Sequence, residues 1–485
     1  MAVRGSTAPE HHAITVVREL CEALESEGVS YCHWKSNAAL DRSRTGQNDL
    51  DLLVRRGDSE VFTAIVHRLG FKQAENPARS LPGVSNYYAY DRAADRFVHI
   101  HAHYQLIVGD DLTKNYRLPL ENAFLDGALQ DGEFRVPPRE LELIALVIRL
   151  TLKHSTWDAL VTRRAKISAR AREELAFLRA RADDELLYRL LQQHLPFVEP
   201  QSFAACLRTL EGTSAARARM RAGQRLAAEL APCARRSRVT DVRLKLWRQT
   251  VGTVRGALNR PPARKRFVAG GALVAVVGGD GAGKSTVVDG LSKWLEKNFA
   301  VTKLHLGKPR RSVTTLAVEA AATPSLAALA LVGRRAPPSS RVRMLVTVVR
   351  ARDRFIAYRN ARRIATNGGL VICDRFPLPE ITLMDAPRVR RVAAAGAENG
   401  IVRRLAALEE RYYRALTAPD VLIVLRVDPE IAVARKPEEA PEFVRARWRE
   451  IWEVDWDAVP AHVIDAGRSA PEVLSDAKAL VWSEL

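Results

Sequence analysis

Residues 278–286 read Gly-Gly-Asp-Gly-Ala-Gly-Lys-Ser-Thr, and this run shapes the expected architecture of the C-terminal half of the chain. It follows the apolar segment 272–277 and precedes a segment with a helical pattern of apolar residues, 287–295. A strand, a glycine-rich loop and the start of a helix form the context that a phosphate-binding loop requires. We expect the phosphates of a nucleotide to contact Gly278, Gly281, Gly283, Lys284, Ser285 and Thr286.

The chemistry of this loop follows from its residue types. Glycines allow backbone N–H groups to turn toward phosphate oxygens, and the helix that follows adds the partial positive charge of its N-terminus. Lys284 supplies a mobile ammonium group for the β- and γ-phosphates, and the Ser285 hydroxyl is the expected ligand of Mg²⁺. The loop therefore predicts ATP and Mg²⁺ as cofactors.

The length and composition of the chain predict a soluble protein of several domains. Its 485 residues exceed the size of one ordinary core, so two or three domains are expected. Hydrophobic residues make up 47% and charged residues 27%, which is the composition of a globular chain. No uncharged apolar run has the length of a membrane span, the first residues lack the apolar core of a secretory signal, and the cysteines have no paired spacing. We therefore expect a cytoplasmic protein without disulfides.

The net charge of +19 is concentrated in one segment. Residues 231–270 contain eleven lysines and arginines against a single acid, Asp241, so more than half of the net charge lies there. Such a density suits contact with anionic lipid, an acidic partner or, less favoured, nucleic acid. Apolar residues at helical spacing, from Val239 to Leu258, are compatible with a helix that lies on a membrane surface. In a cell this would be the inner surface of the membrane. The alternative, which we favour, is a solvated helix between domains.

The pattern of apolar residues divides the chain into four parts. Residues 1–136 mix helices and strands in the manner of an α+β domain, and residues 137–230 form a mainly helical subdomain. A basic linker, residues 231–267, follows. Residues 268–485 alternate strands with helices, which predicts an α/β domain with a doubly wound, mostly parallel sheet.

Further charged residues in the last part fall where a nucleotide-dependent phosphotransferase needs them. The apolar run 370–373 predicts a buried strand that ends in Asp374-Arg375. An acid at the carboxyl end of a strand beside a phosphate loop is placed to hold Mg²⁺, and the adjacent arginine can reach a phosphoryl oxygen. A helix expected from Asp428 runs into Arg435 and Lys436.

With these motifs in order, residues 268–485 resemble the thymidylate kinase group of P-loop nucleoside monophosphate kinases. The resemblance rests on the loop, on Asp374-Arg375-Phe376, on the strand 419–425 with the Val-Asp-Pro-Glu that follows it, and on Ile464-Asp465-Ala466. It implies that Arg435 begins a mobile lid, to which Lys436 and Arg445 add charge, and that Asp353-Arg354 forms an earlier acid-arginine pair. The catalytic residues that it implies are Asp280, Lys284, Asp374, Arg375 and Arg435.

The thymine-binding groups of that family are missing from the matching positions. Where relatives carry Pro-Gly-Gly-Thr, and a serine with a Tyr-Gln pair, this sequence reads His-Leu-Gly-Lys-Pro-Arg at 305–310 and Pro-Leu-Pro-Glu-Ile-Thr at 377–382. An insertion, residues 312–340, precedes the next helix. We therefore expect phosphate donation to be retained and the acceptor site to be rebuilt. An anionic acceptor is predicted by Lys308, Arg310 and Arg311.

In the N-terminal part, a short loop from His33 precedes a strand with Asp49 and Asp51, whose carboxylates point to one face of that strand. With this pattern, about residues 15–155 resemble the nucleotidyltransferase superfamily, and the resemblance implies that the two acids bind divalent metal. Where the family adds a third acid this sequence has His99, which weakens two-metal catalysis. The alternating histidines 99, 101 and 103 share a strand face that suits either a transition metal or an ordinary pocket.

These features predict an enzyme that uses ATP and Mg²⁺ to move the γ-phosphate to a small anionic, nucleotide-like or sugar-like acceptor. Three alternatives stay open. The first is a dTMP kinase proper. The second is a nucleotidyltransferase that acts through the N-terminal part on nucleic acid or a small alcohol. The third is an ATP-gated binding or regulatory protein, in which closure on ATP is transmitted through the basic linker.

Overall fold

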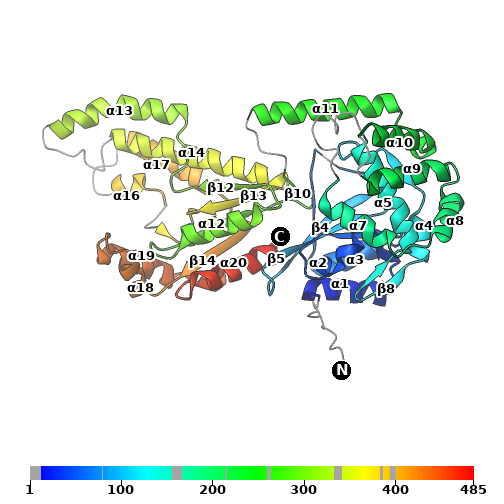
Figure 1. The fold of residues 1–485 in the computed structure, drawn as a ribbon. Helices are drawn as coiled ribbons and strands as arrows, with labels where there is room; N and C mark the ends of the chain where they lie inside the picture. Colours follow the sequence, from blue (N-terminus) through cyan, green and yellow to red (C-terminus); the bar gives the residue numbers. More distant parts are fainter. Residues whose placement is uncertain are drawn as a thin grey trace, which may run out of the picture. The chain divides into compact units, whose positions relative to one another are not determined.

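The computed structural model describes residues 13–78, 80–155, 167–212, 216–258, 264–331, 341–382, 386–393 and 400–485 (Figure 1). The chain divides into two compact units. The N-terminal unit holds residues 1–73 and 78–263, and the C-terminal unit holds residues 74–77 and 264–485. Most of the basic segment expected as a linker, residues 231–263, therefore belongs to the N-terminal unit.

The C-terminal unit is built on five parallel strands in the order β12-β13-β11-β14-β15 (Figure 1). β11, β13 and β14 are apolar and almost wholly buried, as in a sheet that helices cover on both sides. The parallel α/β sheet predicted from the sequence is confirmed. The strands are β11 (Leu273–Gly278), β12 (Val301–His305), β13 (Leu370–Asp374), β14 (Val421–Arg426) and β15 (His462–Asp465), and the short β10 (Arg266–Phe267) precedes them.

Helices lie on both faces of this sheet. α12 (Lys284–Leu295) and α20 (Ala470–Glu484) pack on each other, whereas α14 (Arg341–Thr366) packs with α17 (Gly400–Arg414). The crossovers from β11 to β12 and from β12 to β13 run in opposite directions along the sheet, so right-handed connections place α12 and α14 on opposite faces. Further described helices are α13 (Val313–Leu331), α16 (Val389–Ala393), α18 (Pro429–Arg435) and α19 (Pro441–Glu453).

Strand register brings the chemically important segments to one edge of the sheet. Val276 of β11 lies opposite Asp374 of β13, and Asp374 lies opposite His305 of β12. Gly278 pairs with Leu425 of β14. The phosphate loop, the end of β13 and the segment after β12 therefore meet at the carboxyl ends of the strands, which is where sheets of this kind bind ligands.

The predicted insertion after β12 contains the helix α13, which packs along α14. Ser312 caps the start of α13, because its hydroxyl accepts a hydrogen bond from the Thr315 N–H at 3.2 Å. The Ser312 N–H donates to the Asp353 carboxylate on α14 at 2.9 Å. Residues 332–340 lie outside the described ranges. The beginning of the insertion is thus tied to α14.

The N-terminal unit contains a mixed sheet in the order β1-β2-β5-β4-β3. β2 and β5 are parallel, and the other neighbouring strands pair antiparallel. α1 (Thr15–Ser26) and α3 (Ser59–Arg68) pack on each other and share a buried cluster with the sheet. The strands are β1 (Tyr31–His33), β2 (Leu50–Val54), β3 (Lys72–Glu75), β4 (Val84–Asp91) and β5 (Arg96–His103).

The second half of this unit is helical. α5 (Arg139–His154) lies at its centre, with 13 of 16 residues buried, and packs against α7, α8, α9 and α10. Two small antiparallel strand pairs and two short α-helices also precede α5, namely β6 (Leu106–Val108), β7 (Tyr116–Leu118), β8 (Leu129–Asp131), β9 (Phe134–Val136), α2 (Leu40–Arg44) and α4 (Glu121–Asp126). The helices around α5 are α7 (Ala169–Arg179), α8 (Asp184–His194), α9 (Pro200–Glu211) and α10 (Ala216–Glu229).

The helix α11 (Arg238–Ala257) carries much of the basic segment (Figure 1). One side of α11 is tied to the unit, since Lys245 pairs with Asp110 at 2.8 Å and Thr113 donates to Asp241 at 3.1 Å. None of its residues, all of them described, is buried. Its exposed apolar side chains are Val239, Val242, Leu246, Trp247 and Val254.

The sequence predicts a chain without disulfides and without a membrane-spanning segment. No disulfide joins any of the five cysteines, all of which lie within the described ranges. In the same ranges, no helix is both long enough and apolar enough to cross a membrane.

Candidate functional site

The phosphate loop joins β11 to α12, and geometry requires two of its glycines. Gly283 is the N-cap of α12 with a φ of 85°, a left-handed conformation that glycine adopts without strain. A Cβ atom on Gly279 would lie 2.3 Å from the indole ring of Trp448. The first glycine sets the turn into the helix, and the second lets α19 approach the loop backbone.

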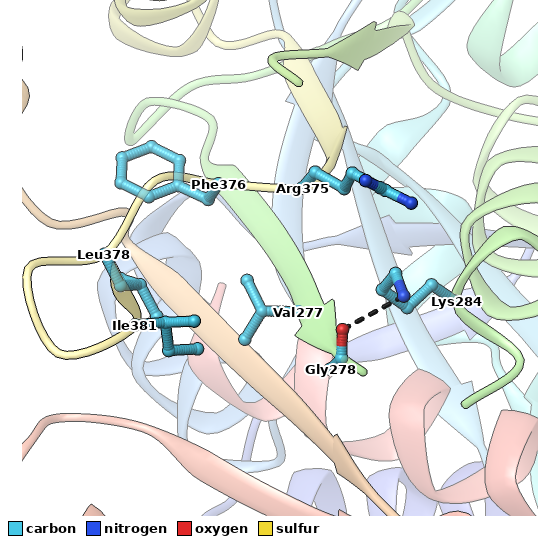
Figure 2. Close-up of a pocket in the computed structure, with 7 residues that line it drawn as sticks. All are labelled: Val277, Gly278, Lys284, Arg375, Phe376, Leu378 and Ile381. Carbon is cyan, nitrogen blue, oxygen red and sulfur yellow. Dashed lines mark hydrogen bonds between the residues drawn. The ribbon is translucent and has the colours of Figure 1, made fainter. Parts of the chain in front are cut away.

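Lys284 is the first residue of α12, and its buried side chain folds back across the loop. The ammonium group donates to the carbonyl oxygen of Gly278 at 3.0 Å (Figure 2) and to that of Gly279 at 2.7 Å. Ser285 and Thr286 follow on the exposed first turn. If phosphates bind to the loop, their oxygens would compete with these two carbonyls for the ammonium group. A lysine that contacts β- and γ-phosphates has to be able to exchange partners in this way.

Asp374 ends β13 and neighbours β11 in the sheet. Its Oδ1 atom is buried and has no hydrogen-bond partner among the described residues. A buried carboxylate oxygen without a donor is suited to a cation, and Mg²⁺ prefers oxygen ligands. The residues present therefore fit a Mg²⁺ ion held by Asp374 together with the Ser285 hydroxyl.

Asp280 is buried in the loop between two arginines. Arg375 donates to one carboxylate oxygen at 3.0 Å, and Arg447 donates to the other. Arg375 has a φ of 59°, which is uncommon for a residue with a Cβ atom and costs energy. The ion pair with Asp280 helps to hold Arg375 in this strained conformation beside the loop.

Arg447 and Trp448 belong to the site, and the sequence interpretation missed them. The Trp448 indole N–H donates to the backbone carbonyl of Asp280 at 3.0 Å. Both residues lie on α19, whose buried face is formed by Val444, Trp448 and Ile451. That helical spacing is visible in the sequence and places Arg447 at the margin of a buried face. It does not reveal that this face packs on the phosphate loop.

The basic residues expected in a lid occupy different places. Arg435 ends α18 and donates to the carbonyl oxygen of Gly281 at 3.3 Å, so its guanidinium contacts the loop. Lys436 and Arg445 instead form ion pairs with acidic residues of their own region, Glu438 and Glu430. Of these three, Arg435 is the residue that contacts the phosphate loop.

An apolar wall adjoins Lys284 and Arg375. It lines a small pocket with them and Gly278, and its side chains are Val277, Phe376, Leu378 and Ile381 (Figure 2). The last three come from the segment after β13, and two of them, Leu378 and Ile381, lie in residues 377–382, where the sequence departs from the thymidylate kinase pattern. Apolar walls keep water away from charged groups, which strengthens the interactions between those groups.

A larger cavity of about 390 Å³ is lined by residues that follow β12 and by residues of α14 and α17. This volume falls within the range of small-molecule sites, roughly 300–1,000 Å³. Five cationic side chains line the cavity against two carboxylates, those of Asp353 and Glu409. Two of the three basic residues predicted to contact the acceptor are present, and Arg310 is not among the lining residues. The cations are Lys308, Arg311, Arg350, Arg354 and Arg388.

Arg354 connects this cationic cavity with the phosphate loop. Its guanidinium donates to the carbonyl oxygen of Leu306 at 2.7 Å. The next residue, Gly307, lies against Arg375, because a Cβ atom on this glycine would be 3.0 Å from the Arg375 Cδ atom. Since Arg375 in turn binds Asp280, the cavity and the loop share one continuous set of contacts.

The two acids of the cavity are engaged by backbone amides. Glu409 accepts hydrogen bonds from the N–H groups of Arg388 at 3.0 Å and Val389 at 2.8 Å, which anchors the start of α16. Asp353 accepts from Ser312, and although burial would raise the pKa of Asp353, hydrogen bonds at the start of α13 hold that pKa below its usual value. With five cationic side chains against these two carboxylates, the lining keeps a net positive charge, and Arg311 and Arg350 also pair with Glu319 on α13.

A second group of ionisable side chains lies on the N-terminal sheet. The Asp51 Oδ1 atom is 3.2 Å from His101 Nδ1 and 2.9 Å from the Lys35 ammonium nitrogen. The Asp49 Oδ1 atom is 2.9 Å from His99 Nδ1. Each of the two predicted metal-binding acids thus has a histidine beside it, and Asp51 also has a lysine.

Burial and neighbouring charge set the protonation of this group. Burial would raise the pKa of Asp51, but the Lys35 ammonium, a hydrogen bond with His101 and the nearby His103 imidazole hold that pKa well below its usual value. Burial lowers the pKa of His103 to about 4. Asp51 is therefore ionised and His103 neutral at pH 7.

No family model matches the chain. The sequence is 28% identical over 229 residues to the "Uncharacterized ATP-binding protein YghR" of Escherichia coli strain K12, a match that covers 43% of this chain and 86% of the relative. The protein of the same name from Escherichia coli O6:H1 matches to the same extent. Among solved structures, a thymidylate kinase from Candida albicans aligns with a TM-score of 0.30 and 17% identity, over 44% of this chain and 91% of that one.

Proposed function

We propose that the protein is an ATP- and Mg²⁺-dependent phosphotransferase, related to the thymidylate kinases, that moves the γ-phosphate of ATP to a small anionic acceptor. The main support is the meeting of three features at one edge of a parallel sheet. These are the phosphate loop with Lys284, the buried oxygen of Asp374 that lacks a donor among the described residues, and the cationic cavity. The relative that binds ATP agrees with the first of them.

In this mechanism the loop amides and Lys284 hold the β- and γ-phosphates, and the ammonium leaves the carbonyls that it contacts without nucleotide. Ser285 and Asp374 would hold Mg²⁺, which would neutralise charge on the phosphate oxygens. An oxygen of the acceptor attacks the γ-phosphorus, and the bond from that phosphorus to the oxygen of the leaving ADP breaks. No proton is released when the attacking oxygen belongs to a phosphate, and a hydroxyl would pass its proton to solvent. Arg375 and Arg435 stabilise the negative charge of the transferred group.

Asp280 has a positioning role in this proposal. Its carboxylate binds Arg375 and Arg447 at once, so it fixes one arginine from the end of β13 and one from α19 beside the loop. Fixed charges stabilise a transition state more effectively than mobile ones, because no reorganisation is needed when the phosphoryl group moves.

The cationic cavity favours an acceptor that already carries negative charge, such as a sugar phosphate or a nucleotide. Arg354 and Lys308 are suited to its anionic group, and the hydroxyls of Thr347 and Tyr413 are suited to polar atoms of the remainder. dTMP is a second candidate acceptor, since Arg354 stands where the related kinases carry an arginine. The rebuilt segments 305–310 and 377–382 count against it.

Two activities from other classes compete with this proposal. Nucleotidyl transfer by the N-terminal unit is supported by Asp49 and Asp51, which flank Leu50 at the start of β2. ATP-gated binding without turnover is supported by the phosphate loop alone. For α11 we propose contact with an anionic lipid surface, supported by its exposed apolar side chains and its arginines.

The test is turnover by the full-length protein with ATP, Mg²⁺ and a panel of nucleoside monophosphates, sugars and sugar phosphates. ADP release and the mass of the acceptor product are measured. We expect Lys284→Ala to lower kcat by roughly 100-fold or more, because it removes a charge that stabilises the transition state. Lys293→Ala, at an exposed lysine of the same helix, is the matched control and should keep full turnover.

Each product pattern selects one candidate. Undiminished turnover in Lys284→Ala contradicts the kinase proposal. Release of pyrophosphate in place of ADP, lost in Asp51→Ala, selects nucleotidyl transfer. ATP binding without any turnover across the panel selects the regulatory role.

A further inference from the structure

We infer that β2 and β5 carry a binding site for a transition-metal dication of the Zn²⁺ type, with Asp51, His101 and His103 as its inner ligands. Asp49 and His99 extend the site toward solvent. The inference concerns the N-terminal unit alone and does not depend on the kinase proposal.

Strand geometry brings these five side chains together. Residues i, i+2 and i+4 of a strand point to one face, so His99, His101 and His103 of β5 form a row of imidazoles. β2 runs parallel to β5, and Asp51 is the register partner of His101. Asp49, two residues before Asp51, lies beside His99 in the same way.

The distances between ligand atoms suit a single small ion. Donor atoms bound to one tetrahedral Zn²⁺ at about 2.1 Å are separated from each other by about 3.4 Å. His101 Nδ1 lies 3.2 Å and His103 Nε2 lies 3.8 Å from Asp51 Oδ1. Asp51, His101 and His103 form one triad, and Asp49, His99 and His101 form another. Within each triad the donor atoms lie within 4.8 Å of one another. Small side-chain rotations would complete either set.

His103 supplies an independent indication of a ligand. Its side chain is only 10% exposed, yet neither ring nitrogen has a hydrogen-bond partner among the described residues. The Trp34 ring contacts the edge of this imidazole at 5.2 Å between centroids, and Nε2 faces the Asp51 carboxylate. Buried polar nitrogens are nearly always satisfied, and a metal ion at this position would satisfy one of them.

The ligand types select the class of ion. Mg²⁺ requires oxygen ligands in an octahedron, whereas imidazole nitrogens favour Zn²⁺ and its transition-metal neighbours. Three imidazoles and two carboxylates therefore favour a metal ion of intermediate softness, such as Zn²⁺. Two contacts outside the cluster fix the orientation of the His99 ring. Its Nε2 atom hydrogen-bonds with Asn86 Oδ1 at 3.0 Å, and the ring stacks on Tyr88. Outer contacts of this kind fix the rings of metal-binding histidines.

Lys35 provides a means of testing where the ion binds. Its ammonium is 2.9 Å from the same Asp51 oxygen and lies over the Trp34 ring. The ammonium and the dication compete for one carboxylate oxygen, so binding of the ion displaces Lys35. Removal of this charge in Lys35→Met should tighten metal binding, whereas removal of a ligand should weaken it.

The experiment is calorimetric titration of Zn²⁺ into full-length protein that has been treated with a chelator and desalted. We expect about one Zn²⁺ per chain, roughly tenfold tighter binding in Lys35→Met, and loss of binding in the double variant His101→Asn/His103→Asn. His67→Asn, at an exposed histidine of α3, is the control and should bind as the wild type does. Co²⁺ should give the visible absorption of a tetrahedral nitrogen and oxygen site in the wild type and lose it in the double variant.

The proposal is overturned if the wild type binds no stoichiometric Zn²⁺, if the double variant binds it unchanged, or if Mg²⁺ at equal concentration displaces it. If the double variant does not fold, Lys35→Met decides. An affinity equal to that of the wild type would place the ion elsewhere and overturn the assignment.

Discussion

Glu142 on α5 shows how burial changes the chemistry of one side chain. It is buried at the centre of the helical half of the N-terminal unit. Its carboxylate accepts hydrogen bonds from the Asn37 side chain at 3.0 Å and from the Asn37 backbone at 3.4 Å. Burial raises the pKa of Glu142 to about 7, and the nearby Glu174 carboxylate adds to this effect against the hydrogen bonds from Asn37.

This shift predicts a pH-dependent stability. The folded state holds the Glu142 proton more tightly than the unfolded state, whose pKa lies near 4.5, so the stabilisation is complete below pH 4.5 and is lost as the pH rises through 7. We expect the free energy of unfolding to fall by at most about 3 kcal/mol from this group between pH 5 and pH 8. Urea unfolding of the wild type and of Glu142→Gln at both values measures it.

In Glu142→Gln the fall should be smaller by that amount, because glutamine carries no charge at either pH. Glu185→Gln, at an exposed position of α8, should keep the wild-type difference. Equal pH dependence in the wild type and Glu142→Gln would show that Glu142 ionises freely in the folded protein.

At the scale of elements, α11 and α19 show two uses of a helical apolar pattern. α19 buries its apolar face and brings Trp448 against Gly279 of the phosphate loop. α11 leaves Leu246 58% exposed and Trp247 65% exposed, while its opposite side pairs with residues 110–113. The sequence predicts α11, and the apolar residues of α19 also have helical spacing, but only the neighbours of each helix decide whether its apolar face is covered.

The exposed face of α11 predicts binding to anionic vesicles. Full-length protein should co-sediment with vesicles that contain phosphatidylserine, less so at high salt, because ions screen the attraction between arginines and lipid. Leu246→Glu should weaken binding by roughly tenfold, since a leucine that enters the bilayer surface is lost. Leu129→Glu, at a residue 68% exposed in the β8–β9 hairpin, is the control. Equal losses in both variants would argue against α11 as the contact.

At the scale of the whole molecule, the chain forms two compact units, each with its own sheet. The phosphate loop, Asp374 and the cationic cavity all belong to the C-terminal unit. The carboxylate and histidine cluster belongs to the N-terminal unit. A ligand that binds one unit stabilises that unit directly, and its effect on the other measures the coupling between them.

This organisation predicts a local response to nucleotide. With a non-hydrolysable ATP analogue and Mg²⁺, amide hydrogen exchange should slow roughly tenfold around the phosphate loop and α19, because bound ligand suppresses local opening. Exchange in residues 13–155 should be unchanged. Lys284→Ala should lose the protection, and Lys293→Ala should keep it. Protection that spreads evenly over both units would contradict independent units.

The sequence alone predicted much of the C-terminal fold and part of its site. Strand, loop and helix signals around residues 278–286, and the apolar run that ends at Asp374, are local patterns, so they can be read without knowledge of the partner elements. They gave the parallel sheet and the positions of Lys284 and Asp374 at its edge. The row of histidines on β5 was also visible, because strand alternation is a local property.

Tertiary structure decided which distant residues complete each site. Arg447 contacts Asp280, which lies 167 positions away in the sequence. Glu409, which lines the cationic cavity, accepts a hydrogen bond from the Arg388 N–H just before α16. The burial of His103 beside Asp51 depends on how β2 and β5 align. These contacts arise from the register of strands and the packing of helices over long separations, and a local pattern of residue types does not contain that information.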